Sequence, residues 1–489
     1  MIHGPSLPGP SGSNSAPRPS AGSPLLLGLD LGSSRIKALL LDGEGSDVGS
    51  ASVATPFESR PEGTEMTVER LLVAVAQVLE RLGDDRSRVT GVGITGMAES
   101  GAPLGGDGRP LAPVIAWHDR RGAATVAMLT QRFGDGLANQ IGQPLRTVSS
   151  VAKLGWSVDH GVDGVRSWLG VPELCLLALT GAHATDYSLA ARTGCYDVTR
   201  RRWLPEVVEA LGLAVTVLPP IQPAGAVMGS VVAAAADWSG LAQGVPVTVA
   251  GHDHLAAFAG AGVGAGRLGN SVGTAETVVA RADRVPDIDR ALAAGTAVSL
   301  FPAGEAWAVF AGAARAGRVL DDAVVTLGRP LDELDRLAEG VGSVDASRWL
   351  ASVEADQRRR RTGAGDGDRD EDGDGDGQDG TEGVLRPPRL PAGSPGTVWR
   401  GVLEALAGRT WEAAQRAMEV TGPASGVVVF GGGSRSRPWL RAKAEACELP
   451  VWRSTAGEAA ARGAAVSAGV SVGWWPSTAA APAAPLEAF

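Results

Sequence analysis

Residues 25–41 read LLLGLDLGSSRIKALLL, and this stretch decides the fold class. Two apolar runs flank Gly32-Ser33-Ser34, a pattern that predicts a strand, a tight turn and a second strand. Turns of Gly and Ser present backbone N–H donors to a phosphate, and a carboxylate such as Asp30 can hold the metal ion that bridges it. We therefore predict a phosphate-binding hairpin, with an ordinary turn as the alternative. Lys37 either adds positive charge at the rim of this site or is a solvated strand residue.

Other sequence patterns exclude several competing folds. No GxxxxGK[ST] occurs, which excludes a P-loop, and no GxSxG or HExxH supports a hydrolase. The glycine run Gly260–Gly266 lacks the strand and helix order of a dinucleotide-binding turn. We interpret that run as close helix packing.

The length and charge of the chain limit its architecture and its partners. A chain of 489 residues is too long for one core and predicts two lobes with a cleft between them. The formal charge of -10 comes mostly from residues 363–383, so the rest offers no basic face to nucleic acid. The three cysteines are far apart and lack CxxC spacing, which favours reduced thiols in the cytoplasm over a zinc site or disulfides. No signal peptide or apolar run of about 18 residues is present, so we expect no membrane attachment.

Periodicity and turn residues predict the elements that follow the first hairpin. The first half contains a helix at 68–82 between Thr67 and Gly83, strands at 89–94 and 245–250, a mostly helical centre at 151–218 and a second hairpin at 268–279 turning at Gly273-Thr274. The second half contains helices at 402–418 and 436–447, a strand at 427–430, a turn at 431–434 and a packed Ala-rich segment at 458–466. The second hairpin repeats the first in kind, and we place a lobe boundary near residue 245.

Three segments are expected outside the core. The arm at 1–24 and the insertion at 357–383, a basic block followed by an Asp-Gly tract, should be disordered. A calcium loop within that tract is disfavoured because its twelfth position is Asp379 and no amphipathic helices flank it. Residues 476–489 should form a peripheral tail.

Residues 251–254 read GHDH and join a predicted strand to a helix. Asp253 would lie at the mouth of a cleft beside a positive helix N-terminus, where we expect it to be ionised. A helix N-cap is the alternative. His252 and His254 are potential metal ligands, but we expect them to face different directions on such a turn, which favours packing or substrate-lining roles.

Six motifs in order resemble the FGGY family of carbohydrate kinases over residues 25–470. They are the first hairpin, GITGMAESGAPLGGDGRPLAPVIAWHDRR at 93–121, TDYSLAARTG at 185–194 followed by Trp203, GHDH at 251–254, NSVGTAE at 270–276, and GGGSRSRPWL at 431–440 with EAAARGAA at 458–465. The resemblance implies an α/β, actin-like (ribonuclease H-like) two-lobed fold with ATP and sugar in the interlobe cleft. The N-terminal lobe at 25–245 would bind sugar and phosphate, and the C-terminal lobe at 246–475 would bind ATP.

The resemblance also implies a role for individual residues. Asp253 is similar to the catalytic base, and Asp30 to a carboxylate linked to Mg2+, directly or through water. Contacts to ATP and its phosphates would come from Gly32, Ser33, Ser34, Lys37, Gly273, Thr274, Gly432, Gly433 and Ser434. ATP and Mg2+ are therefore the expected cofactors.

The acceptor pocket implied by the resemblance is formed by Met97, Glu99 and Trp117, beside Asp253. Glu99 stands where glycerol kinases have Glu and xylulokinases have His. The Arg that precedes it in glycerol kinases is Ala98 here, which argues against glycerol. Asp119 and Arg121 complete a WxDxR pattern that we interpret as structural.

These patterns predict an ATP-dependent sugar kinase whose acceptor is a small carbohydrate, preferably a ketose such as xylulose. A sugar acid such as gluconate and a polyol stay open as acceptors. From another class, a non-catalytic actin-fold module is disfavoured because it would not need Asp30, Glu99 and Asp253 together.

Two departures from the family pattern bear on substrate choice: a short loop at Arg386–Arg389, and the pair Lys443 and Glu445. The expected partners are sugar and ATP, without nucleic acid or membrane. A homodimer is left open.

Overall fold

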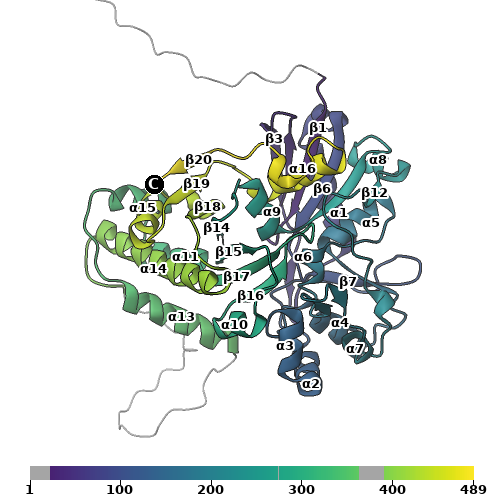
Figure 1. The fold of residues 1–489 in the computed structure, drawn as a ribbon, viewed down its shortest axis with the longest axis horizontal. Helices are drawn as coiled ribbons and strands as arrows, with labels where there is room; N and C mark the ends of the chain where they lie inside the picture. The colour runs from purple at the N-terminus through teal and green to yellow at the C-terminus, as the bar shows by residue number, and fades with distance from the viewer. Residues whose placement is uncertain (1–21, 274, 363–389) are drawn as a thin grey trace, which may run out of the picture.

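The computed structural model describes residues 22–273, 275–362 and 390–489, which form two α/β lobes side by side (Figure 1). The insertion predicted to be disordered starts too early, because residues 357–362 continue a helix. Its remaining residues, 363–383, lie outside the described residues, as do residues 1–21, Thr274 and the Arg386–Arg389 loop. Within the described part of the chain, no helix is both long and apolar enough to cross a membrane.

The first lobe is built on a six-stranded sheet that begins with the predicted hairpin. The strand order is β12 (Gly229–Ser230), β13 (Pro246–His252), β6 (Val89–Gly96), β1 (Leu25–Leu31), β2 (Arg35–Leu41) and β3 (Asp47–Ala54). β1 is antiparallel to β2 and parallel to β6, which is in turn parallel to β13. The C-terminal ends of these three parallel strands therefore meet at one edge, which carries Asp30 and His252.

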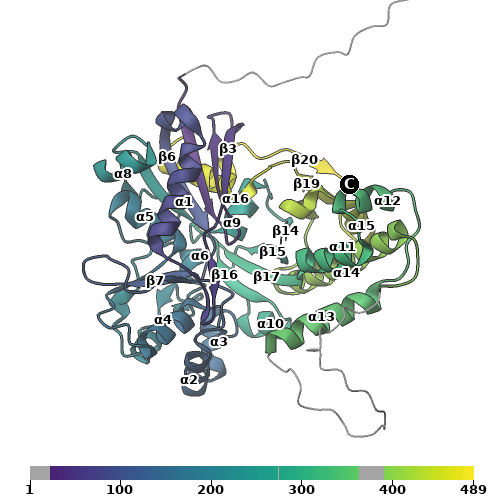
Figure 2. The same ribbon diagram turned by 180° about the vertical axis from the view of Figure 1, so that it is seen from behind.

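Helices cover both faces of this sheet, which explains why β1 is buried along its whole length. α1 (Val68–Glu80), α5 (Val171–Thr180) and α8 (Ala233–Ser239) lie on one face. α9 (Asp253–Gly260) and α16 (Ala459–Ser471) lie on the other, so α16 is in front in Figure 1 and α1 is in front in Figure 2. As predicted, Thr67 caps α1 by accepting a hydrogen bond from the Arg70 N–H, although α1 ends three residues before Gly83.

The lobe boundary predicted near residue 245 divides this sheet and needs correction. β13 begins at Pro246 and pairs with β6 in the first lobe. α9 and α16, both assigned to the second lobe by sequence, pack against strands of the first. The predicted boundary was wrong because β13, which completes the sheet of the first lobe, comes long after its neighbour β6 in the chain.

The second lobe repeats the strand order of the first. Its seven-stranded sheet runs β16 (Ala297–Leu300), β17 (Trp307–Ala314), β15 (Glu276–Ala282), β14 (Leu268–Val272), β18 (Val427–Phe430), β19 (Val451–Ser454) and β20 (Leu486–Ala488). The hairpin β14–β15 and the parallel strands β18 and β19 correspond to β1–β2 and to β6 and β13. This confirms the structural echo between the two hairpins. Around this sheet lie α10 (Ile288–Ala293), α11 (Ala316–Leu327), α12 (Leu331–Ala338), α13 (Ser347–Thr362), α14 (Pro395–Thr421) and α15 (Arg437–Ala446).

Residues 58–115 and the centre of the chain at 151–218 form a smaller region, and this centre is less helical than predicted. Its five-stranded sheet runs β4 (Glu58–Arg60), β5 (Gly63–Met66), β8 (Val114–Ile115), β7 (Gly101–Leu104) and β9 (Ser167–Gly170). Short helices pack around it: α2 (Ala123–Phe133), α3 (Asp135–Ile141), α4 (Ser150–Asp159), α6 (Tyr187–Ala190) and α7 (Pro205–Glu209). The brief strands β10 (Tyr196–Asp197) and β11 (Arg202–Trp203) interrupt the predicted helical run, because two-residue strands leave no periodic signal.

The C-terminal tail is not peripheral, contrary to expectation. β20 pairs with β19 and forms the edge of the second sheet. Ala481 packs against an apolar cluster that includes Leu26 of the first sheet. The tail therefore contacts both lobes.

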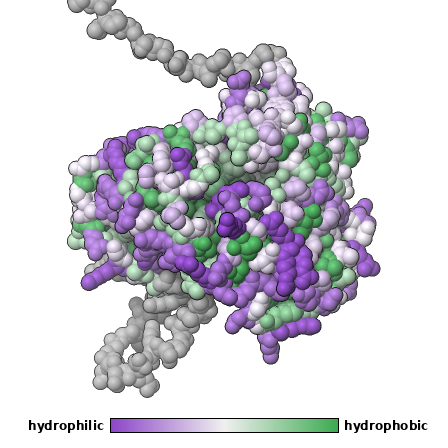
Figure 3. Space-filling view, viewed as in Figure 1, coloured by the Kyte–Doolittle hydropathy of each residue, from purple (hydrophilic) through white to green (hydrophobic). Residues whose placement is uncertain are grey.

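The surface offers no strong apolar feature on the face shown in Figure 3. Hydrophilic and hydrophobic residues are intermingled over both lobes in that view.

Four glycines allow α16 to lie directly on neighbouring backbone. A Cβ atom at each position would fall within 2.0 Å of a carbonyl oxygen across the contact, at Gly28, Gly93, Gly260 and Gly463. Gly260 meets Ala459, and Gly463 meets Ala256, so each helix of the α9–α16 pair carries one of these glycines. This bears out the packing interpretation for the first residue of the glycine run at 260–266.

We expect Gly93→Ala to lower the thermal midpoint, because the new methyl group would overlap the Ala464 carbonyl. Overpacking of this kind costs about 1–3 kcal/mol, and here the neighbour is backbone that cannot rotate away. Gly408→Ala in α14 is the matched control: its Cβ meets nothing within 4 Å, and Ala should stabilise a helix by up to about 1 kcal/mol. Equal midpoints for Gly93→Ala and the unchanged protein would contradict the contact.

Candidate active site

Asp30 and the turn after it lie at the edge of the first sheet that faces the second lobe. Asp30 is 7% exposed, and its Oδ1 makes no hydrogen bond within the described residues. Burial and then the charge of Asp253 raise the pKa of Asp30 to about 7, while Lys37 opposes the shift. The turn is held by the Thr55 hydroxyl, which donates to the Gly32 carbonyl at 2.6 Å. Ser33 and Ser34 on this turn are half-buried and exposed, respectively.

Lys37 lies beside the N-terminus of α16. Its Nζ is 2.7 Å from Glu458 Oε2, at the N-terminus of α16, and its charge lowers the pKa of both Asp30 and Asp253. Lys37 is therefore part of the charged cluster and not a solvated strand residue.

Asp253 is the first residue of α9 and follows a β-bulge in β13. The bulge falls between Val249 and Gly251, and Gly251 has φ +87. A side chain at this glycine would overlap Ser188, whose hydroxyl accepts a hydrogen bond from the His252 N–H. The bulge turns the end of β13 so that the next residues reach the cleft.

The pKa of Asp253 is higher than a position at a helix N-terminus alone would give. Burial and then the charge of Glu99 raise the pKa of Asp253 to about 7, although 29% of its side chain is exposed to the cleft. The carboxylate accepts one hydrogen bond, from the His254 N–H at 2.7 Å. His252, not Asp253, occupies the N-cap position, so the N-cap alternative does not hold. A carboxyl group with a pKa near 7 is suited to exchange protons at neutral pH.

His252 and His254 also differ from expectation, because their rings lie close together. The ring centroids are 5.2 Å apart, and each ring contacts Phe310 of the second lobe. One ligand atom from each histidine and one from Asp253 lie within 4.8 Å of one another. The extended backbone of His252, followed by the first turn of α9, brings both rings to the same side.

Glu99 lies beside a small pocket and has an unusual backbone. Its φ is +66, a region that non-glycine residues rarely adopt, and such strain clusters at functional sites. Its Oε1 accepts a hydrogen bond from Arg192 Nε at 2.7 Å, and the Arg192 Nη1 donates to Gln143. The pocket is lined among others by Met97, Glu99, Ser150, Trp168, Glu173 and Thr185.

Arg192 and Glu173 are candidate site residues that we did not single out from sequence. Arg192 belongs to the TDYSLAARTG motif, so that motif could have indicated it, but no local pattern pairs it with Glu99. Burial raises the pKa of Glu173 to about 7, its Oε1 accepts from Thr185, and its Oε2 makes no hydrogen bond within the described residues.

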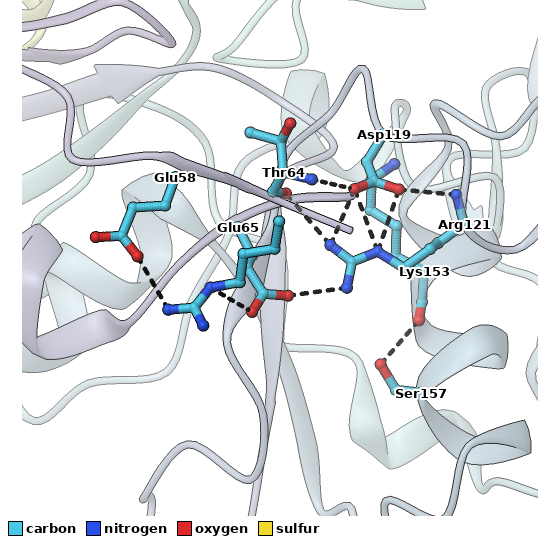
Figure 4. Close-up of polar contacts among 8 residues, drawn as sticks. Glu58, Thr64, Glu65, Asp119, Arg121, Lys153 and Ser157 are labelled. Carbon is cyan, nitrogen blue, oxygen red and sulfur yellow. Dashed lines mark hydrogen bonds and ion pairs between the residues drawn. The ribbon is translucent and has the colours of Figure 1, made fainter. Parts of the chain in front are cut away.

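The loop that follows β8 contains Trp117, Asp119 and Arg121. The Trp117 N–H donates to the hydroxyl of Ser100, the residue after Glu99. Asp119 accepts from the Thr64 N–H and from Arg121, which also pairs with Glu65 at 2.9 Å (Figure 4). Asp119 and Arg121 therefore fasten β5 to this loop, in agreement with their structural interpretation.

The second lobe brings its two glycine turns together. β14 and β18 are parallel neighbours, so the turn at Gly273 lies beside the residues after β18. Gly431 has φ +95, and a Cβ there would overlap the Val272 carbonyl. Gly432 is exposed and has open space where a side chain would stand, whereas Gly433 packs on Val272 and the buried Ser434 donates to the Gly431 carbonyl.

Two domain profiles of one protein family match this sequence. The profile of the N-terminal domain of the FGGY family of carbohydrate kinases matches residues 25–260, and that of the C-terminal domain matches residues 378–472. The chain belongs to the FGGY family of carbohydrate kinases. The resemblance inferred from the six motifs is thereby confirmed.

Similar proteins match this chain over different shares of their own length. L-fuculokinase from Salmonella typhi is 30% identical over 53% of this chain and 57% of its own. Glycerol kinase from Gloeobacter violaceus is 27% identical over 92% of this chain and 88% of its own. A xyloylose kinase structure from Brucella ovis has a TM-score of 0.78 at 23% identity and covers 95% of this chain and 93% of its own. This likeness confirms the two-lobed, actin-like fold.

The first hairpin of this FGGY chain fits a hydrated Mg2+. A buried carboxylate oxygen without a partner is costly unless water or a cation satisfies it, which is the situation of Asp30 Oδ1. Mg2+ prefers oxygen ligands and keeps several of its waters. Asp30 is therefore the residue that would hold it.

Proposed function

We propose that this chain is an ATP-dependent kinase that transfers the γ-phosphoryl group of ATP to a hydroxyl of a small, uncharged carbohydrate, most simply a ketose. The observation that carries this proposal is the position of Asp253. The charge of Asp253 raises the pKa of Asp30 in the phosphate hairpin. The charge of Glu99 in the pocket in turn raises the pKa of Asp253. One carboxylate thus connects the predicted phosphate site with the predicted acceptor site.

The mechanism needs little covalent chemistry from the protein. Asp253 would accept the proton of the attacking hydroxyl, and the turns at Gly32 and Gly273 would hold the phosphates through backbone N–H groups. A bound Mg2+ supplies charge neutralisation on the phosphates. Positioning and electrostatic stabilisation account for most of the rate enhancement in phosphoryl transfer.

The charges around the pocket favour a neutral acceptor over a sugar acid. Glu99, Glu173 and Asp253 would each repel a substrate carboxylate when ionised. Arg192 is already engaged by Glu99 and Gln143, and Lys153 donates to the Thr147 and Val148 carbonyls. A ketose or polyol instead offers hydroxyls that can donate to these carboxylates. We therefore place ketoses first, polyols second and gluconate last.

ADP release by the purified protein, measured with Mg-ATP across a panel of ketoses, polyols and sugar acids, tests this proposal. Stimulation by one ketose would support it. Stimulation by gluconate alone would keep the kinase and overturn the neutral acceptor, and nucleotide binding without stimulation by any acceptor would favour the non-catalytic module.

We expect kcat/KM to rise with pH and level off above about pH 7. Asp253 must be deprotonated to act as a base, and its pKa is raised to about 7, so activity should fall tenfold per pH unit below that value. The profile should be recorded between pH 5.5 and 9 with the best acceptor.

Replacing Lys37 provides the control for this pH profile. Its positive charge lowers the pKa of Asp253, so Lys37→Met should move the acidic limb to higher pH. A limb near pH 4 in the unchanged protein would contradict the raised pKa of Asp253.

A further inference from the structure

The three consecutive side chains of His252, Asp253 and His254 form a cluster that differs from the expected arrangement. Three ligand atoms, one from each residue, lie within 4.8 Å of one another. His252 Nε2 is 3.3 Å from Asp253 Oδ1. Two ligands of a tetrahedral zinc ion, each about 2.1 Å from the metal, are about 3.4 Å apart. The separation of this pair therefore already matches a zinc site.

We propose that His252, Asp253 and His254 bind a single Zn2+ ion, separate from the Mg2+ of the nucleotide, and that this ion blocks the catalytic carboxylate. Two imidazoles and one carboxylate are a ligand set that holds zinc through three protein residues and leaves a fourth position open. Asp253 and His254 are both partly exposed to the cleft, so an ion could enter from solvent.

Packing holds the cluster in place before any ion binds. His252 is 8% exposed, and the rings of His252 and His254 both contact Phe310 of the second lobe. The two imidazoles are therefore held beside Asp253.

Mg2+ should not replace zinc here. It prefers oxygen ligands in octahedral geometry, whereas imidazole nitrogens suit Zn2+. The proposed inhibition rests on the kinase function argued above, because the ion would occupy the carboxylate that accepts the proton. Binding of the ion does not rest on that function.

The first test is direct binding of Zn2+ to the metal-free protein, in competition with a chromophoric chelator and with millimolar Mg2+ present. We expect one ion per chain, and at least tenfold weaker binding for His252→Gln, His254→Gln and Asp253→Asn. His160→Gln is the control, because His160 is exposed and stacks on Trp156 away from the cluster. Equal affinity of all four variants, or less than one ion per chain, would overturn the site.

Two measurements on the unchanged protein guard against misfolded variants. Bound Co2+ should give the intense visible absorption of a tetrahedral site, and the weak bands of octahedral Co2+ would contradict the proposed geometry. Added Zn2+ should inhibit sugar-stimulated ADP release, and a chelator should restore it. Zinc binding without any sugar-stimulated turnover would retain the metal site and reject the kinase, so the two proposals fail separately.

Discussion

Asp253→Asn should lower kcat by about 10²–10⁴-fold and leave nucleotide binding intact. The amide has the shape of the carboxyl group but cannot accept the proton of the attacking hydroxyl, and loss of a general base typically has an effect of this size. Turnover with the best acceptor and the affinity for ATP should be measured on the same preparation. Activity within a few-fold of the unchanged protein would remove Asp253 from the mechanism.

Two controls separate this effect from misfolding. Asp237→Asn changes an exposed carboxylate on α8 and should keep full activity. The thermal midpoint of Asp253→Asn at pH 8 should equal or exceed that of the unchanged protein. The raised pKa means that ionising Asp253 costs free energy in the folded state, and this cost is present above pH 7 and absent in the amide.

Lys443→Met should reduce the free energy of unfolding by about 3–5 kcal/mol. Lys443 and Glu276 form an ion pair in the core of the second lobe, with side chains 2% and 0% exposed. Asn270 and Thr410 also donate to the same Glu276 oxygen, at 3.0 and 2.7 Å. Removing one member of a buried pair leaves an uncompensated charge, which accounts for the size of the effect.

The double variant Lys443→Met with Glu276→Gln tests the cause of that loss. It should recover a large part of the stability, because no charge is then left buried. Glu333→Gln breaks the exposed pair with Arg329 on the outer face of the second lobe and should cost less than about 1 kcal/mol. If Lys443→Met and Glu333→Gln have equal effects, the buried pair does not carry the stability assigned to it.

The pair Lys443 and Glu445 departs from the family pattern, and the burial of Lys443 gives this residue a structural role. Lys443 points into the core beneath the β14–β15 hairpin, whereas Glu445 is on the surface and pairs with Arg400. The structure therefore connects Lys443 with support of the second hairpin.

Local signals in the sequence were sufficient for the elements and the family. The two hairpins, the cap at Thr67 and the strand at Val427–Phe430 were predicted because strand alternation, turn glycines and capping depend on neighbours in the chain. The order of six motifs then identified the family. The same motifs named Asp30, Glu99 and Asp253 as site residues.

What the sequence by itself determined was therefore the type and order of the elements, the FGGY family and the residues to suspect. Only the tertiary structure decided that β13 completes the first sheet, that Arg192 pairs with Glu99, and that the rings of His252 and His254 lie edge to face beside Asp253. It also decided the pKa of Asp253. These properties depend on burial and on contacts between residues far apart in the chain, such as Arg192 with Glu99 and Val247 with Val92, and neither leaves a periodic or compositional trace along the chain.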